Sequence, residues 1–170
     1  MIVRALTLAG GLTGAVGLSQ FPEFSQQYLQ RLGGAVDELG IITQQYEADA
    51  AAAGMALPDY ISALSQEGAL SKTQAGNMQA HLDRYSSLSA ALTQLQGAGP
   101  FMRARLAANM SDHGVAKRTL DEFKPAIPAT FEGAVFAGSG FLGGWLGLKL
   151  VFAFLAGLWG SATSLFRRPA

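Results

Sequence analysis

The sequence has no cysteine among its 170 residues and only two histidines. The lack of cysteine excludes disulfides, thiolate zinc sites, iron–sulfur clusters and a cysteine nucleophile. Charged residues are scarce at 14% of the chain, and twelve basic residues balance twelve acidic ones, so no global basic field is present to hold nucleic acid. Period-two runs of valine, isoleucine and threonine are also missing, which argues against strands and predicts an all-α fold.

The two histidines do not have the neighbours of a catalytic or metal site. Asp83 follows His81 by two residues and therefore lies on a different helix face, and a zinc site needs three or four ligands. Asp112 and His113 are adjacent and rarely face each other, and no Gly-x-Ser-x-Gly sequence is present. We therefore predict no catalytic residue, no metal site, no cofactor and no enzymatic activity. A hydrolytic enzyme that uses one of the histidines is the weakest alternative.

Hydrophobic residues make up 49% of the chain and are concentrated at its two ends. Arg4 is the only charge in residues 2–18, and Lys149 is the only charge in residues 133–166. Apolar blocks of this length match the thickness of a bilayer. The sequence therefore predicts a membrane protein with two transmembrane helices that flank an extramembrane helical hairpin domain. The predicted segments are a first span at 1–20, a helical domain at 21–130, a second span at 131–166 and a tail at 167–170.

The charges that flank the two spans predict the orientation of the chain. Arg4 lies at one end, and Arg167 and Arg168 lie at the other. Both sets favour the cytoplasmic side, which places the central domain in the periplasm. The first block is short enough for a cleaved signal peptide to remain an alternative to an anchor.

The central region carries two amphipathic helical patterns. Large apolar residues recur every three or four positions over residues 24–46 and again over residues 78–95. Two such helices in succession bury their apolar stripes by forming an antiparallel hairpin. We expect short segments at 59–66, 101–109 and 115–123 to pack across this hairpin.

Glycine is unusually frequent in the predicted spans. The second span contains two overlapping Gly-x-x-x-Gly sequences, and the first contains one. Because no hydrophobic force drives helices together in lipid, small residues that allow close backbone approach favour their association. We predict that these glycines pack the two spans on each other or on a helix of a partner. The predicted packing residues are Gly10, Gly14, Gly140, Gly143, Gly144 and Gly147.

Lys149 lies within an apolar run that is longer than one crossing requires. Its ammonium group either extends into the headgroup region or pairs with an acidic residue of a partner, and we favour the first. Trp159 suits the membrane interface. The residues predicted to contact lipid or a partner are Lys149, Trp145, Trp159, Arg103, Arg105, Arg167 and Arg168.

Two stretches carry a resemblance to a known family. Residues 19–28 read SQFPEFSQQY, and residues 32–38 read LGGAVDE. They resemble an uncharacterised family of small bacterial membrane proteins, known only as a domain of unknown function. The resemblance implies an inner-membrane protein with two terminal spans and a helical domain, and it brings no activity.

These observations favour a non-enzymatic accessory, assembly or scaffold subunit of an inner-membrane complex. Its expected partners are membrane lipid and either another protein or further copies of the chain. The alternative is a small transport or pore-forming homo-oligomer that is lined by the glycine-rich span, with Lys149 setting a preference for anions.

Overall fold

The computed structural model describes residues 1–110 and 112–166, with side chains described as far as residue 159. Every regular element in this part of the chain is a helix, which confirms the all-α prediction. The helices are α1 (Ile2–Ser19), α2 (Phe21–Ala52), α3 (Leu57–Gln66), α4 (Ala69–Gln96), α5 (Pro100–Arg105), the 3₁₀ helix η1 (Ala107–Asn109), α6 (His113–Asp121) and α7 (Phe131–Phe166). The chain divides into a terminal unit, residues 1–24 and 124–170, and a central unit, residues 25–123.

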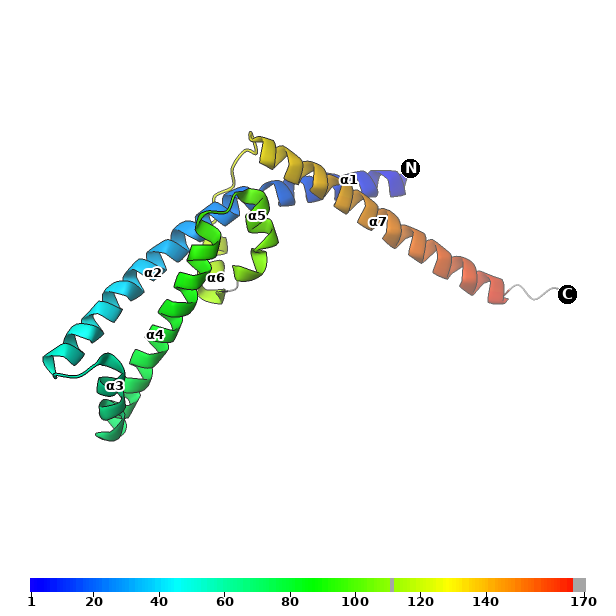
Figure 1. Ribbon diagram of the computed structural model, residues 1–170. Helices are drawn as coiled ribbons and strands as arrows, with labels where there is room; N and C mark the ends of the chain where they lie inside the picture. Colours follow the sequence, from blue (N-terminus) through cyan, green and yellow to red (C-terminus); the bar gives the residue numbers. More distant parts are fainter. Residues whose placement is uncertain (111, 167–170) are drawn as a thin grey trace. The chain divides into compact units, whose positions relative to one another are not determined.

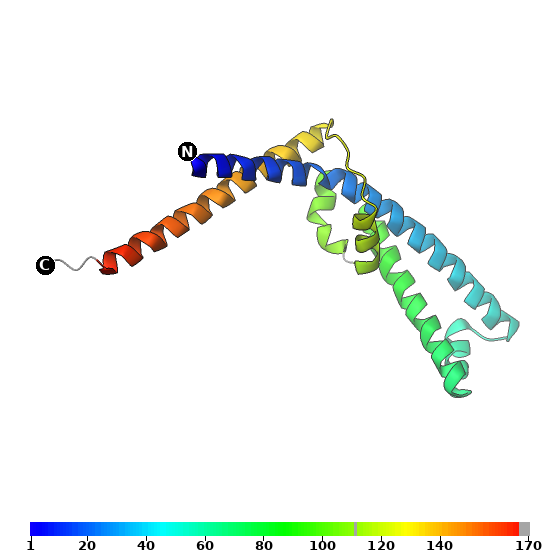
Figure 2. The same ribbon diagram turned by 180° about the vertical axis from the view of Figure 1, so that it is seen from behind.

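The terminal unit pairs α1 with α7, and the two helices cross in both views (Figures 1 and 2). The 18 residues of α1 span about 27 Å, which is close to the thickness of a bilayer core, whereas the 36 residues of α7 span about 54 Å. Two helical stretches are long and apolar enough to cross a membrane, namely Ile2–Ala52 near the N-terminus and Phe131–Trp159. Large apolar side chains along both helices are exposed, as expected where lipid is the solvent.

The linker before α7 is tied to the end of α1 within the terminal unit. Gln20, the single residue between α1 and α2, donates from Nε2 to the Ala126 carbonyl oxygen at 3.1 Å and accepts from the Ala126 N–H at 3.0 Å. Residues 123–129 have no regular structure, and Pro128 packs closely against Gly133 in the first turn of α7. The aromatic rings of Phe21 and Phe136 approach to 5.4 Å between centroids. The returning chain is therefore held against the start of α2.

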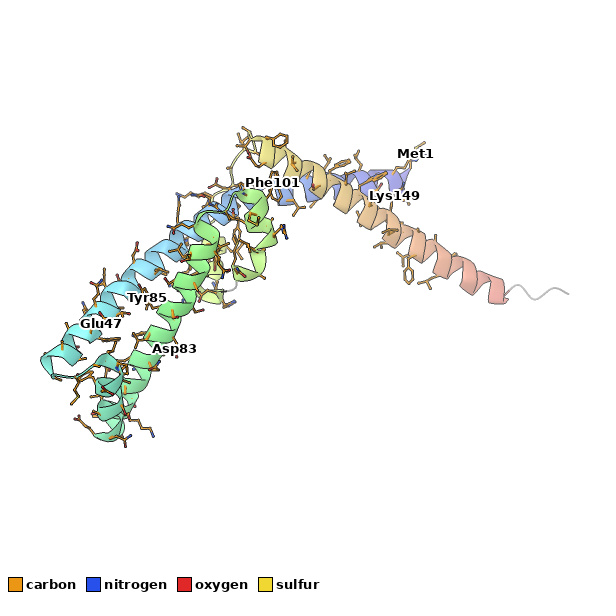
Figure 3. All side chains as sticks on the ribbon, viewed as in Figure 1. Met1, Glu47, Asp83, Tyr85, Phe101 and Lys149 are labelled. Atoms are coloured by element: carbon orange, nitrogen blue, oxygen red, sulfur yellow. The ribbon has the colours of Figure 1, made fainter. Side chains whose placement is uncertain are left out.

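The central unit is built on α2 and α4, which run antiparallel. Each contributes one apolar stripe, and the buried members are Tyr28, Leu32, Val36 and Leu39 from α2 with Ala75, Met78, Leu88 and Leu95 from α4. The Tyr46 hydroxyl and His81 Nδ1 are hydrogen-bonded at 2.8 Å between the two helices. Tyr85 projects from the side of α4 that faces α2, and its ring lies 3.5 Å from the position a Cβ would take at Gly40 (Figure 3). Helix α4 begins nine residues before the predicted stripe, and α3 packs against α4.

Local sequence signals explain where the shorter helices begin and end. Proline occupies the first turn of α3 and of α5, where its missing N–H costs nothing. Asp112 caps α6 by accepting a hydrogen bond from the Val115 N–H at 2.8 Å. Gly54 ends α2 at a φ of +71°, a left-handed conformation that favours glycine and closes a Schellman turn. The predicted segment 101–109 is divided into α5 and η1.

Candidate functional site

The contact between α1 and α7 is made by glycine backbones. A Cβ added at Gly14 would overlap the Gly140 carbonyl oxygen, and one added at Gly144 would overlap the Gly10 carbonyl oxygen. Such close approach brings Cα–H groups to facing carbonyl oxygens, a weak interaction that recurs at helix contacts. Gly10, Gly14, Gly140 and Gly144 therefore form one antiparallel helix-packing site in the terminal unit.

Larger side chains close the two flanks of this contact. Leu148 lies over Gly10, and the Phe141 ring lies 2.8 Å from the position a Cβ would take at Gly11. Gly11 was not among the residues predicted from the sequence, although it adjoins the Gly10-x-x-x-Gly14 pattern. Its role depends on the aromatic ring of the facing helix, which spacing within one segment does not reveal.

The second Gly-x-x-x-Gly sequence of α7 takes no part in this contact. A Cβ at Gly143 or at Gly147 would meet no atom within 4 Å in the described part of the chain. A helix advances 100° per residue, so Gly143 lies about 60° around α7 from Gly140, and Gly147 lies about 60° from Gly144. The structure thus separates two patterns that overlap in the sequence into an occupied face and an open one.

Lys149 has an aromatic partner on its own helix. Its Nζ lies 4.3 Å from the ring centroid of Trp145, one helical turn earlier. A cation–π contact of this kind is worth more in an environment that excludes water. The two predicted contact residues are therefore brought together, and Lys149 lies on the exposed surface of α7 (Figure 3).

The other predicted contact residues are distributed over several elements. Trp159 is exposed near the end of α7. Arg103 on α5 donates from Nη1 to Gln26 Oε1 at 2.8 Å, and Arg105 is exposed two residues later. Arg167 and Arg168 lie outside the described residues. Lys117, a further basic residue on α6, forms an ion pair in which its Nζ lies 2.6 Å from Asp121 Oδ2.

The histidines occupy structural positions in the central unit. His81 bonds Tyr46 between α2 and α4. His113 begins α6 and borders a polar pocket of about 290 Å³ that also contains Tyr28, Ser87, Asn109 and Asp112. Among the described residues, no group of three or more histidine and carboxylate side chains is arranged to hold a metal ion.

Tyr28 has an unusual environment at the base of this pocket. Its side chain is 0% exposed, and burial raises the pKa of its hydroxyl above the usual 10.0. The Asp112 carboxylate raises this pKa further, and the Asp112 backbone partly offsets the rise. The folded state therefore disfavours the tyrosinate form.

This environment predicts a pH-dependent stability. The contribution from Tyr28 is fully present below pH 10 and is lost as the pH rises from there through the higher pKa of the folded state, because the unfolded chain ionises first. We expect the unfolding free energy of the wild-type protein to fall more steeply above pH 10 than that of Tyr28→Phe. Chemical denaturation between pH 8 and pH 11.5 measures both. Equal dependence of the unfolding free energy on pH in the two proteins would contradict the prediction. The ionisation of the other tyrosines contributes equally to both proteins and does not affect the comparison.

Comparison with protein families gives a match over nearly the whole chain, from residue 2 to residue 161. Comparison with curated proteins and with solved structures gives no match. The matched range includes α1, the central unit and most of α7, so the contact between the terminal helices lies within it. The chain belongs to the family described as Protein of unknown function (DUF2937).

Proposed function

We propose that the protein is a membrane-anchored accessory or assembly subunit that binds a partner protein and has no enzymatic activity of its own. The observation that carries this proposal is the unequal use of the two glycine patterns in α7. The pattern of Gly140 and Gly144 is filled by α1, whereas that of Gly143 and Gly147 is open. In lipid, an open small-residue face beside an existing helix pair suits the close approach of a third apolar helix.

The length of α7 supports the same conclusion. Helix α1 has 18 residues and α7 has 36. Helix α1 is therefore long enough to cover only half of α7. Side chains along the later turns, such as Leu150 and Phe154, are exposed. A partner helix would cover this apolar surface without any change in the α1–α7 contact.

The proposed location is a bacterial inner membrane, with both termini in the cytoplasm and the central unit in the periplasm. The flanking charges Arg4, Arg167 and Arg168 support this orientation through the positive-inside rule. The central unit then extends into the periplasm, where it offers a second surface for the same complex.

Two side chains that suggest chemistry in the sequence have structural partners, which supports a binding role over an enzymatic one. His81 is hydrogen-bonded to Tyr46. Asp112 caps α6 and receives both terminal nitrogens of Arg84, at 3.0 and 3.1 Å.

Site-specific photo-crosslinking in native membranes tests the proposal. Leu150 lies within about 20° of Gly143 on the helix surface, whereas Leu142 lies about 100° away. A photoreactive residue at Leu150 should give one defined adduct, either with a partner protein or with a second copy. The adduct should be lost in Gly143→Leu and retained in Gly138→Leu, since Gly138 is also open but lies on the far side of α7.

Two results would count against the proposal. The absence of any adduct from Leu150, or equal adducts from Leu150 and Leu142, would contradict a specific helix-docking face. A Lys149-dependent ion current from the purified protein in bilayers would instead favour the transport alternative.

A further inference from the structure

Three arginines from three different helices line one pocket of the central unit. The pocket has a volume of about 400 Å³ and lies where α2, α4 and α6 meet. We call it the arginine pocket, and its lining residues are Arg31, Ala35, Glu38, Leu39, Arg84, Val115 and Arg118. Three guanidinium groups and a single carboxylate therefore share one small surface with apolar walls.

Two of the arginines are positioned by carboxylates outside the pocket lining. Arg84 forms a two-pronged pair with Asp112, and Asp112 is itself fixed by its capping bond to the Val115 N–H. Arg31 pairs with Glu122, whose side chain is 66% exposed. These pairs hold the two guanidinium groups at the pocket and offset part of their positive charge, and neither carboxylate belongs to the pocket lining.

Arg118 differs from the other two. Its Nε donates to the Gly114 carbonyl oxygen at 3.2 Å, which aligns the side chain along α6. The ion pairs among the described residues involve Arg31, Arg84 and Lys117, and none of them includes Arg118. Arg118 is exposed, and its Nη2 lies near Asp112 Oδ1 and Arg84 Nη2 around Gly114 without forming an ion pair of its own.

We propose that the arginine pocket binds a phosphate group, with Arg118 as the main ligand and Arg31 and Arg84 as supporting ligands. Planar guanidinium forks match the spacing of phosphate oxygens, and more than one is needed to balance a doubly charged group. Ala35, Leu39 and Val115 supply the apolar part of the pocket lining beside the guanidinium groups. This inference does not depend on the docking function proposed for α7.

The bound phosphate belongs either to a free phosphate ion or to a lipid headgroup, since both present the same oxygens. Glu38 is the only acid in the pocket lining, and its charge opposes either ligand. Replacing Glu38 should therefore tighten binding, whereas replacing Arg118 should weaken it. General attraction to a basic surface would produce the same two directions, so a matched control outside the pocket is needed to identify a site.

Isothermal titration of the full chain in a neutral maltoside detergent with inorganic phosphate tests the proposal. At low ionic strength, Arg118→Gln should weaken binding about tenfold or more, and Glu38→Gln should strengthen it about two- to fivefold. Arg118→Lys should give an intermediate loss, because it keeps the charge but not the fork. Lys72→Gln is the control of matched charge, since Lys72 is exposed on α4 and lies outside the pocket lining, and it should leave binding unchanged.

Competition with water-soluble glycerophosphoglycerol identifies the source. If glycerophosphoglycerol displaces phosphate at a concentration equal to or below that of phosphate, the site is assigned to a lipid headgroup. If a higher concentration of glycerophosphoglycerol is needed, the site is assigned to the free phosphate ion. The proposal is overturned if the wild-type protein gives no binding isotherm at millimolar phosphate, or if Arg118→Gln binds as well as the wild type. Unchanged far-ultraviolet circular dichroism and melting temperature exclude unfolding as the cause of a loss.

Discussion

Gly14→Leu should separate α1 from α7. A leucine side chain at this position overlaps the Gly140 carbonyl oxygen, and backbone atoms cannot rotate away as a flexible side chain does. The helices must move from glycine contact towards the usual separation of about 8–10 Å. Overpacking of this kind costs about 1–3 kcal/mol, which is enough to shift a weakly held pair towards splayed arrangements.

Spin-label distances measure this separation directly, because the chain has no native cysteine to label. Labels on Val3→Cys and Leu158→Cys, both at exposed positions, report the distance between the two helices by double electron–electron resonance. A single narrow distribution is expected in the otherwise wild-type protein. A longer and broader distribution is expected with Gly14→Leu.

Gly143→Leu is the matched control for this measurement. It adds the same side chain to α7 where no atom lies within 4 Å, so the distance distribution should not change. An unchanged distribution in Gly14→Leu would refute the packing site. An equal broadening in Gly143→Leu would show that bulk anywhere on α7 disturbs the pair.

Leu32→Ala should have the largest effect on the stability of the central unit. Leu32 is 0% exposed and lies in the middle of the buried stripe of α2, so its truncation leaves a cavity in the core. Such a change costs about 2–5 kcal/mol, a large part of the stability of a small helical domain. Hydrogen exchange of the full chain in detergent should show faster exchange throughout the protected amides of α2 and α4.

Ile41→Ala provides the comparison on the same helix. Ile41 is 52% exposed, so its truncation removes few contacts and should cost less than about 1 kcal/mol. The amides of the terminal unit should exchange at the wild-type rate in both variants if the two units are stable independently. Equal destabilisation by the two variants would contradict the assignment of Leu32 to the core.

The helical content was predictable because its signals are local. The apolar stripes of residues 24–46 and 78–95 lie within α2 and α4, since a period near 3.6 determines both the helix and its buried face. Proline at 58 and 100 and the aspartate at 112 mark helix starts for reasons that need no tertiary contact. Helix α4 is longer than its stripe and packs against α3, a neighbour that periodicity does not reveal.

The candidate sites were only partly predictable, because they depend on residues that are distant in sequence. The four glycines of the α1–α7 contact belong to recognised patterns, yet nothing in the spacing selects Gly140 and Gly144 over Gly143 and Gly147. The direction from which α1 approaches α7 determines which glycines are in contact. The arginine pocket is formed by three separate segments, which contribute Arg31, Arg84 and Arg118, so no sequence motif indicates it.

The amino-acid sequence by itself determined which parts of the chain are apolar enough to suit lipid, that the chain is helical, and which face of each amphipathic helix avoids water. These properties depend on composition and on spacing within one segment. Only the tertiary structure decided that one glycine face of α7 is filled and the next is open, and that three arginines surround a common pocket. The physical reason is that a contact depends on the relative position of two helices, whereas periodicity describes each helix alone.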